Sequence, residues 1–565
     1  MKVRTNSTRS RALKVTAATA ILALGALTLQ PSQAQLVDKA SPEAPAASSH
    51  GGPGSVKDFT GLTHAQRANL YAIAKRTWKF YADDVDPQTH LPLDNLTYAG
   101  GSKTPTDYGR YTSSANVGTY LWAVVSAQDL GLITHREAGK LARATLRSVQ
   151  EMASYEGFLY QWYNSSTRQV ITNPGQAACA TTTGTFDNCS FISNVDNGLY
   201  AAGLIEVRQA IPSARGLAHK LMKRMDFGIF YDDRAQTHCN TNPAITGNQP
   251  TGQMYGGYYV GSPPDEGDNY THYYHNGALY SDPRMSAYIG MGRHEMPGAV
   301  WWRSWRELPP PAPFADCQQT DPDFSWQGQW PMEGKWTTII DPQSHKPFPV
   351  WEGHYTYPGS NLKFIPTYGG GMFEGLMDNT VVPETSWGPH SFGLADKRWA
   401  RVQIKYTKEE LDLRVWGMSP SSTADDSGGY GIYGVEGLKF PYYGFGSSEE
   451  NPNLGLSQCH GCATEDVVTP HASFIALDVT PQRAYRNIQK LRTLYPGLYG
   501  SHGFFDAVNP STGAVGHRIL VLDQSMIMAS LDNALRNRAL QRHFAADPIS
   551  QVAHTYLSYE HMTLD

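Results

Sequence analysis

Six segments of the chain repeat one pattern, in which a few small or polar residues precede a helix-length apolar run. The repeats begin at Thr112, Ser190, His275, Thr367, Val467 and Leu520. Between most of them lies a stretch with one charged face, as in residues 136–152 and 214–225. Buried helices that alternate with amphipathic helices predict two concentric helical layers, with the polar starts of the inner helices meeting at one end.

The N-terminal region is predicted to lie outside this helical fold. Five basic residues in the first fourteen precede an apolar run over 15–29, and Ser32-Gln33-Ala34 supplies small residues for signal peptidase. We therefore expect a signal peptide over 1–34 and an exported protein, periplasmic or extracellular; an uncleaved anchor is the alternative. Residues 35–56 are rich in Pro, Ala, Ser and Gly and predict a flexible leader. Residues 57–565 are predicted to form a single domain, because a helical toroid grows by adding helix pairs.

Composition narrows the partners of the chain. Charged residues make up 17%, the net charge is -5 and no basic run is present, so nucleic acid is not expected as a partner. After signal cleavage we expect no membrane contact, and we expect a monomer. The chain has 32 Tyr and 13 Trp, and such rings stack on the apolar faces of sugars, although most aromatic side chains pack in cores.

The six cysteines of an exported protein predict disulfide bonds. Cys179 with Cys189, and Cys239 with Cys317, are candidate pairs, but sequence alone does not determine connectivity. Residues 459–462 read Cys-His-Gly-Cys in a Gly- and Asn-rich stretch. That context favours a disulfide that staples a loop over a redox motif or a zinc site.

Acidic residues lie at or near the starts of the inner helices. These residues are Asp196, Asp282, Glu374 and Asp523. A carboxylate at a helix start is favoured simply as a cap, which accounts for each residue better than for the set. Asp506 differs because it follows two Phe residues in a predicted loop, where an acid is costly unless it is paired or functional. An Asx-type turn with Asn509 is the alternative.

The motif content points to acid–base chemistry. The chain has no nucleophile elbow, Walker loop, paired-Gly dinucleotide fingerprint or His-Glu-x-x-His motif, so we expect no metal and no cofactor. Two separated carboxylic acids in an aromatic-lined helical cup are typical of glycosidic bond cleavage. One acid protonates the leaving oxygen and the other activates water.

Several segments resemble the glycoamylase-like or endo-β-1,2-glucanase superfamily, which includes the transglycosylating domain of cyclic β-1,2-glucan synthases. The resemblance lies in YGGGMFEGLM (368–377), 415–438, DVVTPHASFIALDVTP (466–481), LYGSHGFFDAVNP (498–510) and LDQSMIMASLDNAL (522–535), and in the N-terminal half in 112–133, 191–205 and 277–292. It implies an all-α (α/α)6 barrel and an inverting hydrolase with two catalytic acids.

The resemblance also implies catalytic roles. Asp506 matches the general base, and Asp282 stands where relatives typically have a Glu as general acid. The Asp carboxyl is withdrawn by about 1.5 Å, which a relay through a substrate hydroxyl would accommodate. Asp425 or Asp426 is the alternative acid. Synthase-like members carry a Glu shortly after a Trp-Gly pair, and this chain has Ser419-Pro420 there, which favours the hydrolase branch.

Further residues match motif positions that line the sugar subsites. They are Asp196, Glu374, Trp387, Trp416, Tyr430, His471 and Asp523. For the aromatic residues among them, barrel packing is the alternative. Arg284 is either a substrate contact or half of a buried ion pair.

The sequence therefore predicts a secreted inverting glycoside hydrolase acting on β-linked glucan, with β-1,2-glucan favoured. A carbohydrate-binding barrel without catalysis is one alternative. A polysaccharide lyase is another, but the inner-helix starts contain almost no Lys or Arg to neutralise a uronate.

Overall fold

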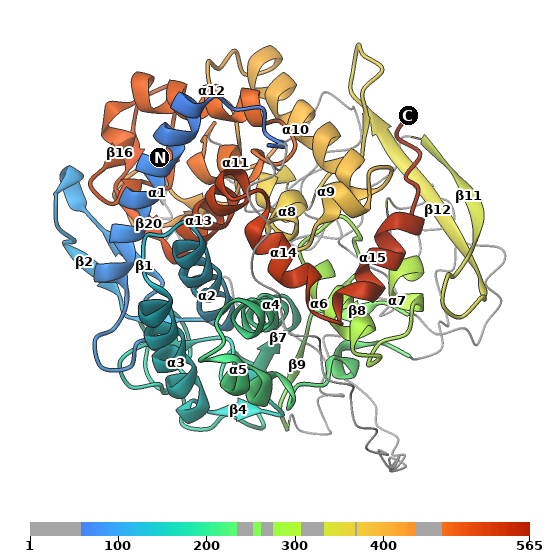
Figure 1. Ribbon diagram of the computed structural model, residues 1–565, viewed down its shortest axis with the longest axis horizontal. Coiled ribbons are helices and arrows are strands. Elements are labelled where there is room, and N and C mark those ends of the chain that lie inside the picture. Colours follow the sequence, from blue (N-terminus) through green and yellow to red (C-terminus); the bar gives the residue numbers. More distant parts are fainter. Residues whose placement is uncertain are drawn as a thin grey trace, which may run out of the picture.

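Helices make up most of the frame of the protein, and they lie in two layers (Figure 1). The computed structural model describes residues 58–233, 252–261, 275–304, 306, 333–367, 370–435 and 466–565. Each repeat of the sequence pattern contributes one inner helix. The inner helices are α2 (Ser114–Asp129), α4 (Asn194–Ala210), α6 (Arg284–Gly292), α8 (Met372–Leu376), α11 (Pro470–Ile475) and α13 (Val521–Leu535).

Each inner helix has an outer helix packed against it. The pairs are α2 with α3 (His135–Glu151), α4 with α5 (Arg215–Met222), α6 with α15 (Ser550–Tyr559), α8 with α10 (Phe392–Glu409), α11 with α12 (Pro481–Leu494) and α13 with α1 (His64–Asp84). Shorter helices, α7 (Ala299–Arg303), α9 (Glu384–Trp387) and α14 (Ala539–Ala545), complete the set in the described ranges. The two predicted helical layers are present.

Sequence determines which layer a helix occupies. In α2 every residue from Ser114 to Gln128 is buried, and the Ser113 hydroxyl caps the helix by accepting from the amide of Asn116. In α3 only one face is buried, and Thr134 with Glu137 forms a capping box at its start. A helix that is apolar all round belongs inside, whereas a helix with one apolar stripe covers it.

Neighbouring inner helices contact one another in order. Helix α2 lies against α4 and α13, α4 lies against α6, and α11 lies against α8 and α13. A Cβ atom placed on Gly118 of α2 would lie 2.4 Å from the carbonyl oxygen of Leu199 in α4, so glycine permits this close approach. Between α6 and α8, Arg284 donates to the carbonyl of Gly375 at 2.6 Å. Closure of all six helices into an (α/α)6 barrel stays a prediction.

The all-α prediction is wrong in part, because short antiparallel strands accompany the helices. The longest pair is the hairpin of β11 (Glu333–Ile340) and β12 (Pro347–Thr356), to which β13 (Lys363–Phe364) adds (Figure 1). The other strands have two or three residues, which is too short for a period-2 pattern to be recognised in sequence.

The short strands fix the loops that enter the inner helices. Strand β3 (Tyr111–Thr112) precedes α2, β7 (Phe191–Ser193) precedes α4, and β20 (Arg518–Leu520) precedes α13. Strand β7 pairs with β9 (Gly257–Tyr259), and β20 pairs with β1 (Asn95–Thr97), which also pairs with β2 (Asp107–Gly109). The polar starts of these helices are therefore held by backbone hydrogen bonds.

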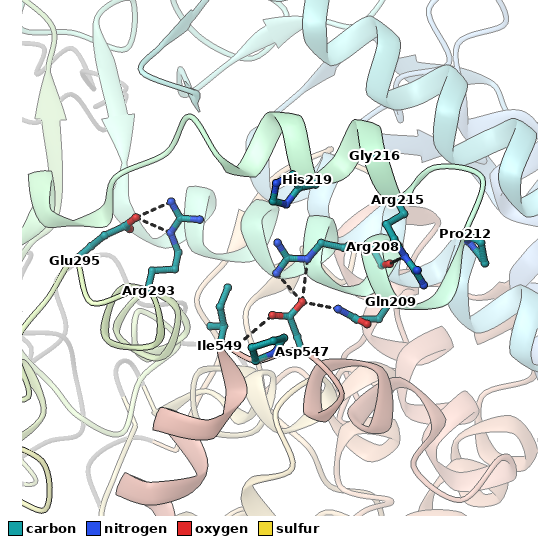
Figure 2. Close-up of a pocket in the computed structure, with 11 residues that line it drawn as sticks. Arg208, Gln209, Pro212, Arg215, Gly216, His219, Arg293, Glu295, Asp547 and Ile549 are labelled. Atoms are coloured by element: carbon teal, nitrogen blue, oxygen red, sulfur yellow. Dashed lines mark hydrogen bonds and ion pairs between the residues drawn. The ribbon is translucent and has the colours of Figure 1, made fainter. Parts of the chain in front are cut away.

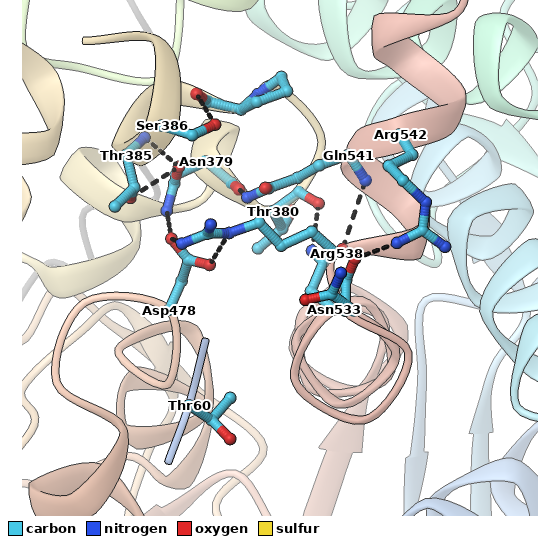
Figure 3. A network of polar contacts seen from close by, with 12 residues as sticks. Thr60, Asn379, Thr380, Thr385, Ser386, Asp478, Asn533, Arg538, Gln541 and Arg542 are labelled. Carbon is cyan, nitrogen blue, oxygen red and sulfur yellow. Dashed lines mark hydrogen bonds and ion pairs between the residues drawn. The ribbon is translucent and has the colours of Figure 1, made fainter. Parts of the chain in front are cut away.

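A polar network fastens the opposite ends of three inner helices (Figure 3). Arg538 donates to Asp478, which follows α11, with Nε and Oδ1 2.9 Å apart. Asn379, which follows α8, donates to the same carboxylate at 3.2 Å. Asn533 of α13 donates to the carbonyl of Thr380 at 2.7 Å. These contacts hold the helix ends together on the side away from the acidic starts.

Buried side chains from Leu62 to Leu564 form one contiguous hydrophobic core cluster. The predicted disulfide between Cys179 and Cys189 is present, with Cα atoms 5.7 Å apart. The other four cysteines lie outside the described residues, as do the predicted signal peptide and leader. No helix among the described residues has the length and apolar character needed to span a bilayer.

Candidate active site

Two groups of carboxylates form at the starts of the inner helices. The first group comprises Asp196 in the first turn of α4, Asp282 just before α6, and Glu374 in α8. The second group comprises Asp523 in the first turn of α13 and Asp506, which lies between β17 (Gly503–Phe504) and β18 (Ala507–Val508).

In the first group, Ser281 connects Asp282 with Glu374. The Ser281 hydroxyl donates to Glu374 at 3.0 Å and lies 3.4 Å from Oδ1 of Asp282. Burial raises the pKa of Asp282 to about 6, and repulsion from Asp196 adds to this, whereas hydrogen bonding with Glu374 and the charge of Arg284 oppose it. Asp282 therefore holds a proton at mildly acidic pH, as a general acid must.

Arg284 fixes the backbone beneath these two acids. Its Nε and one terminal nitrogen donate to Glu384 at 2.7 and 2.9 Å. The remaining donors reach the carbonyls of Ser281, Glu374 and Gly375, so all five guanidinium N–H groups are used. These contacts favour the buried ion pair over the substrate contact for Arg284, because the residue is 2% exposed and its five N–H donors are used.

In the second group, Asp506 is buried among polar groups. Its Oδ2 accepts from the Ser422 hydroxyl at 2.8 Å and from the amide of Leu520 at 2.9 Å. In the described part of the chain its Oδ1 has no hydrogen-bond partner. Burial, followed by repulsion from Asp523, raises the pKa of Asp506 well above its usual value. Oδ1 of Asp506 is therefore a buried acceptor without a partner among the described residues.

Asp523 lies close to His471 and is affected by the charge of Asp94. His471 of α11 is 3.0 Å from its Oδ2, and both side chains are almost fully buried. Burial raises the pKa of Asp523, and the neighbouring His471 opposes that rise. Asp94, which the sequence reasoning missed, adds a further negative charge and accepts from Asn116 and Asn95, each at 2.8 Å. Asp94 precedes a strand and not a helix, so the helix-start pattern gave no signal for it.

Acids of both groups act electrostatically on the phenol of Tyr430. The surrounding protein raises the pKa of its phenol, and the carboxylates of Asp523, Glu374, Asp94 and Asp282 raise it further. The side chain is nevertheless 53% exposed. Tyr430 in β15 (Tyr430–Gly431) also pairs with Ser422 in β14 (Ser421–Ser422), whose hydroxyl binds Asp506. The backbone pairing of Tyr430 therefore leads to Asp506, and the charges of both groups act on its phenol.

An aromatic and polar wall links Asp506 with Asp196, and the sequence reasoning missed its members. Arg518, whose charge lowers the pKa of Asp506, lies 3.2 Å from the hydroxyl of Tyr111. Tyr111 meets Trp162 edge to face, with ring centroids 5.8 Å apart. Gln161, the neighbour of Trp162, donates to Asp196 at 2.9 Å. Aromatic abundance was the only sequence signal for this wall.

The remaining predicted residues lie apart from these contacts. Trp416 is 8% exposed within the hydrophobic core, and its backbone is hydrogen-bonded to Asn487 of α12. Trp387 ends α9 and packs on His554 of α15, with centroids 4.9 Å apart. The described contacts of both rings favour packing.

The two alternative acids, Asp425 and Asp426, have lowered pKa values, which disfavour proton donation. Hydrogen bonds from Ser427 and Thr423 lower the pKa of exposed Asp425. The pKa of Asp426 is lowered by hydrogen bonds from the backbone of His517 and Gly100, which outweigh the opposing effect of burial. Both carboxyls are therefore ionised where Asp282 still carries a proton.

A hollow lies at the ends of α4 and α6 opposite the acidic starts (Figure 2). It encloses about 1010 Å³, and its charged groups are largely paired. Arg208 donates to Asp547 at 2.9 Å, and Arg293 donates to Glu295 at 2.7 Å. None of the predicted catalytic or sugar-binding residues lines this hollow.

Comparison with known proteins agrees with this architecture. Residues 362–548 match the family model "Putative glucoamylase", and residues 72–254 match a family described as "Protein of unknown function (DUF3131)". The cyclic β-(1,2)-glucan synthase NdvB of Rhizobium meliloti is 29% identical over 137 residues, which are 24% of this chain and 4% of that protein. This chain therefore spans only a small part of the curated relative.

Solved structures share the fold across most of the chain. A putative glucoamylase of Bacteroides caccae has 16% identity and a TM-score of 0.57, covering 87% of this chain and 98% of its own. An endo-β-1,2-glucanase of Chitinophaga pinensis, in complex with sophorotriose and glucose, has 14% identity and a TM-score of 0.55, covering 88% and 98%. Together with the family match, these shared folds confirm the resemblance of the chain to the glycoamylase-like or endo-β-1,2-glucanase superfamily.

Proposed function

We propose that the protein is an exported, inverting glycoside hydrolase that cleaves β-linked glucan, with β-1,2-glucan as its substrate. The observation that carries the proposal is the pair of acid groups at the starts of the inner helices, whose charges both act on the phenol of Tyr430. One group holds a proton on Asp282, and the other offers an unpaired carboxylate oxygen on Asp506. The substrates of the glucanase relatives support the choice of a β-1,2 linkage.

In the proposed reaction Asp282 gives its proton to the glycosidic oxygen as the bond from that oxygen to the anomeric carbon breaks. A water molecule attacks the anomeric carbon from the opposite face, and Asp506 takes its proton. The new C–O bond then has the inverted configuration. The transition state carries positive charge on the sugar ring, which the nearby carboxylates of Asp94 and Asp523 would stabilise.

The test is to incubate the purified protein with linear β-1,2-, β-1,3- and β-1,4-glucans and to follow product size and anomeric form by NMR. We expect oligosaccharides from the β-1,2-glucan, first released as the α-anomer. Retained β-configuration would overturn the inverting mechanism, and products from another linkage alone would overturn the substrate assignment.

Two experimental results would favour a function other than hydrolysis. Calorimetric binding of β-1,2-glucan without any product would identify a carbohydrate-binding barrel. An unsaturated product absorbing in the ultraviolet would identify a lyase. The full use of Arg284 within the protein argues against a lyase, because it leaves that cation unable to neutralise a uronate.

A further inference from the structure

The C-terminal segment and the loop between α9 and α10 bring three potential metal ligands together. His390 lies in that loop, and His561 and Asp565 follow α15. One ligand atom of each residue lies within 4.8 Å of the ligand atoms of the other two. In the part of the chain that the structure describes, no other group of His, Cys, Asp and Glu has this geometry.

The backbone that carries these ligands is anchored. Met562 and Leu564 are each 1% exposed, so the alternate positions His561 and Asp565 face outward from a fixed segment. The amide of Met562 donates to the carbonyl of His390 at 3.0 Å. Lys363 of β13 donates to the carbonyl of Asp565 at 2.9 Å. The three ligands therefore come from segments already joined by hydrogen bonds and core packing.

The two imidazoles are free to bind a ligand. Their rings are stacked, with centroids 5.4 Å apart and planes 13° from parallel. Some histidines of the described residues pair with carboxylates, as His543 does with Asp129 at 2.7 Å, whereas the rings of His390 and His561 have no hydrogen bond or ion pair among the described residues. Asp565 is 69% exposed, and its contact with Arg398 is long at 3.9 Å, which leaves its second oxygen open.

We propose that His390, His561 and Asp565 form a binding site for a late first-row divalent cation, with Zn²⁺ as the natural candidate. Two imidazoles and one carboxylate suit Zn²⁺, Co²⁺, Ni²⁺ or Cu²⁺, whereas Ca²⁺ and Mg²⁺ prefer oxygen ligands. Ligand atoms around tetrahedral zinc lie roughly 3.3 Å apart, given metal–ligand bonds of about 2.0–2.1 Å. Exposed side chains reach that spacing by small rotations about their χ angles. Water completes the coordination.

The site would act as a clamp on the C-terminal segment. Binding would tie that segment to the start of α10, where Ser391 already donates to the carbonyl of Leu557 in α15 at 2.8 Å. A cation that binds the folded chain and not the unfolded chain raises the thermal midpoint. The site lies in a different part of the chain from the acids of the candidate active site, so it is independent of the proposed hydrolysis.

The test is a Zn²⁺ titration of the full chain, prepared without a histidine tag and stripped with EDTA, by calorimetry and by equilibrium dialysis with metal analysis. We expect His390→Ala and His561→Ala each to bind one Zn²⁺ fewer per chain than the wild type. Asp565→Asn should weaken that site roughly tenfold. His64→Ala and His135→Ala, which remove exposed histidines of α1 and α3, are the matched controls and should bind as the wild type does.

A second readout is the thermal midpoint. Saturating Zn²⁺ should raise it by about 2 °C in the wild type and in both controls, but not in His390→Ala or His561→Ala. Equal Zn²⁺ stoichiometry in the wild type and the two variants would overturn the proposal. So would an absence of Zn²⁺ binding to the wild type at about 100 μM. Comparing variants with the wild type removes the contribution of any other zinc-binding residues.

Discussion

The pKa of Asp282 predicts where the activity should fall as the pH rises. With a pKa of about 6, roughly nine-tenths of the carboxyl is protonated at pH 5 and roughly one-tenth at pH 7. Since a general acid acts only in its protonated form, titration of Asp282 should set the alkaline limb of the kcat/KM profile, whereas the raised pKa of the base Asp506 should set its acid limb. Above pH 7 kcat/KM should fall about tenfold per pH unit.

A substitution at Asp196 should shift the pH at which the activity falls on the alkaline side. Its negative charge helps to raise the pKa of Asp282, so Asp196→Asn should lower that pKa. The alkaline limb should then shift to lower pH, by roughly a few tenths of a unit to one unit. The assay is the initial rate of reducing-sugar release from β-1,2-glucan between pH 4 and 8, with the thermal midpoint measured at each pH.

The matched control is Glu151→Gln, which neutralises an exposed carboxylate of the outer helix α3. It should leave the limb in place. An alkaline limb near pH 8 or above, or a limb that does not move in Asp196→Asn, would refute the assignment of Asp282 as the titrating acid. A fall in the thermal midpoint that parallels the loss of rate would show that unfolding, and not titration, sets the limb.

Three further substitutions test other parts of the structure. Asp506→Asn should abolish turnover and leave the thermal midpoint nearly unchanged, because the amide oxygen can still accept from Ser422 and Leu520. A thermal midpoint that falls together with the activity would show that Asp506 is structural. Arg284→Met should cost about 3–5 kcal/mol of unfolding free energy in denaturant titrations, because it leaves Glu384 buried without its partner, and a cost below about 1 kcal/mol would contradict the ion-pair role. Gly118→Ala should destabilise by about 1–3 kcal/mol through overlap with α4, whereas Gly216→Ala, whose Cβ meets open space, should not; similar midpoints for the two would disprove the close approach.

Much of the frame and part of the site could be predicted from the sequence. The repeats identified all six inner helices, because in each repeat an apolar run follows a short polar start. The same starts identified Asp196, Asp282, Glu374 and Asp523, and the loop acid Asp506 stood out beside two Phe residues. Their contacts with Ser281, Ser422 and Tyr430 are consistent with that prediction but do not test the catalytic roles.

The rest depended on contacts between residues distant in the chain. Asp94 meets the site only because β1 pairs with β20, more than 400 positions later, and no local pattern encodes that pairing. An arginine two residues from Asp282 is a reasonable candidate for a substrate contact in the sequence. Only the positions of Glu384 and three carbonyl groups show that its donors are used. The β11–β12 hairpin was missed because the repeat pattern concerns helices alone.

The pairing of β1 with β20 also limits how the gene for this protein can be divided. Residues 362–548, which match the glucoamylase family, include Glu374, Asp506 and Asp523 but neither Asp94 nor Asp282. A fragment cut at those boundaries would lack Asp282, the proposed proton donor, and would leave β20 without its partner strand. Complementary fragments expressed together would have to rebuild that strand pair before either could contribute to a working centre.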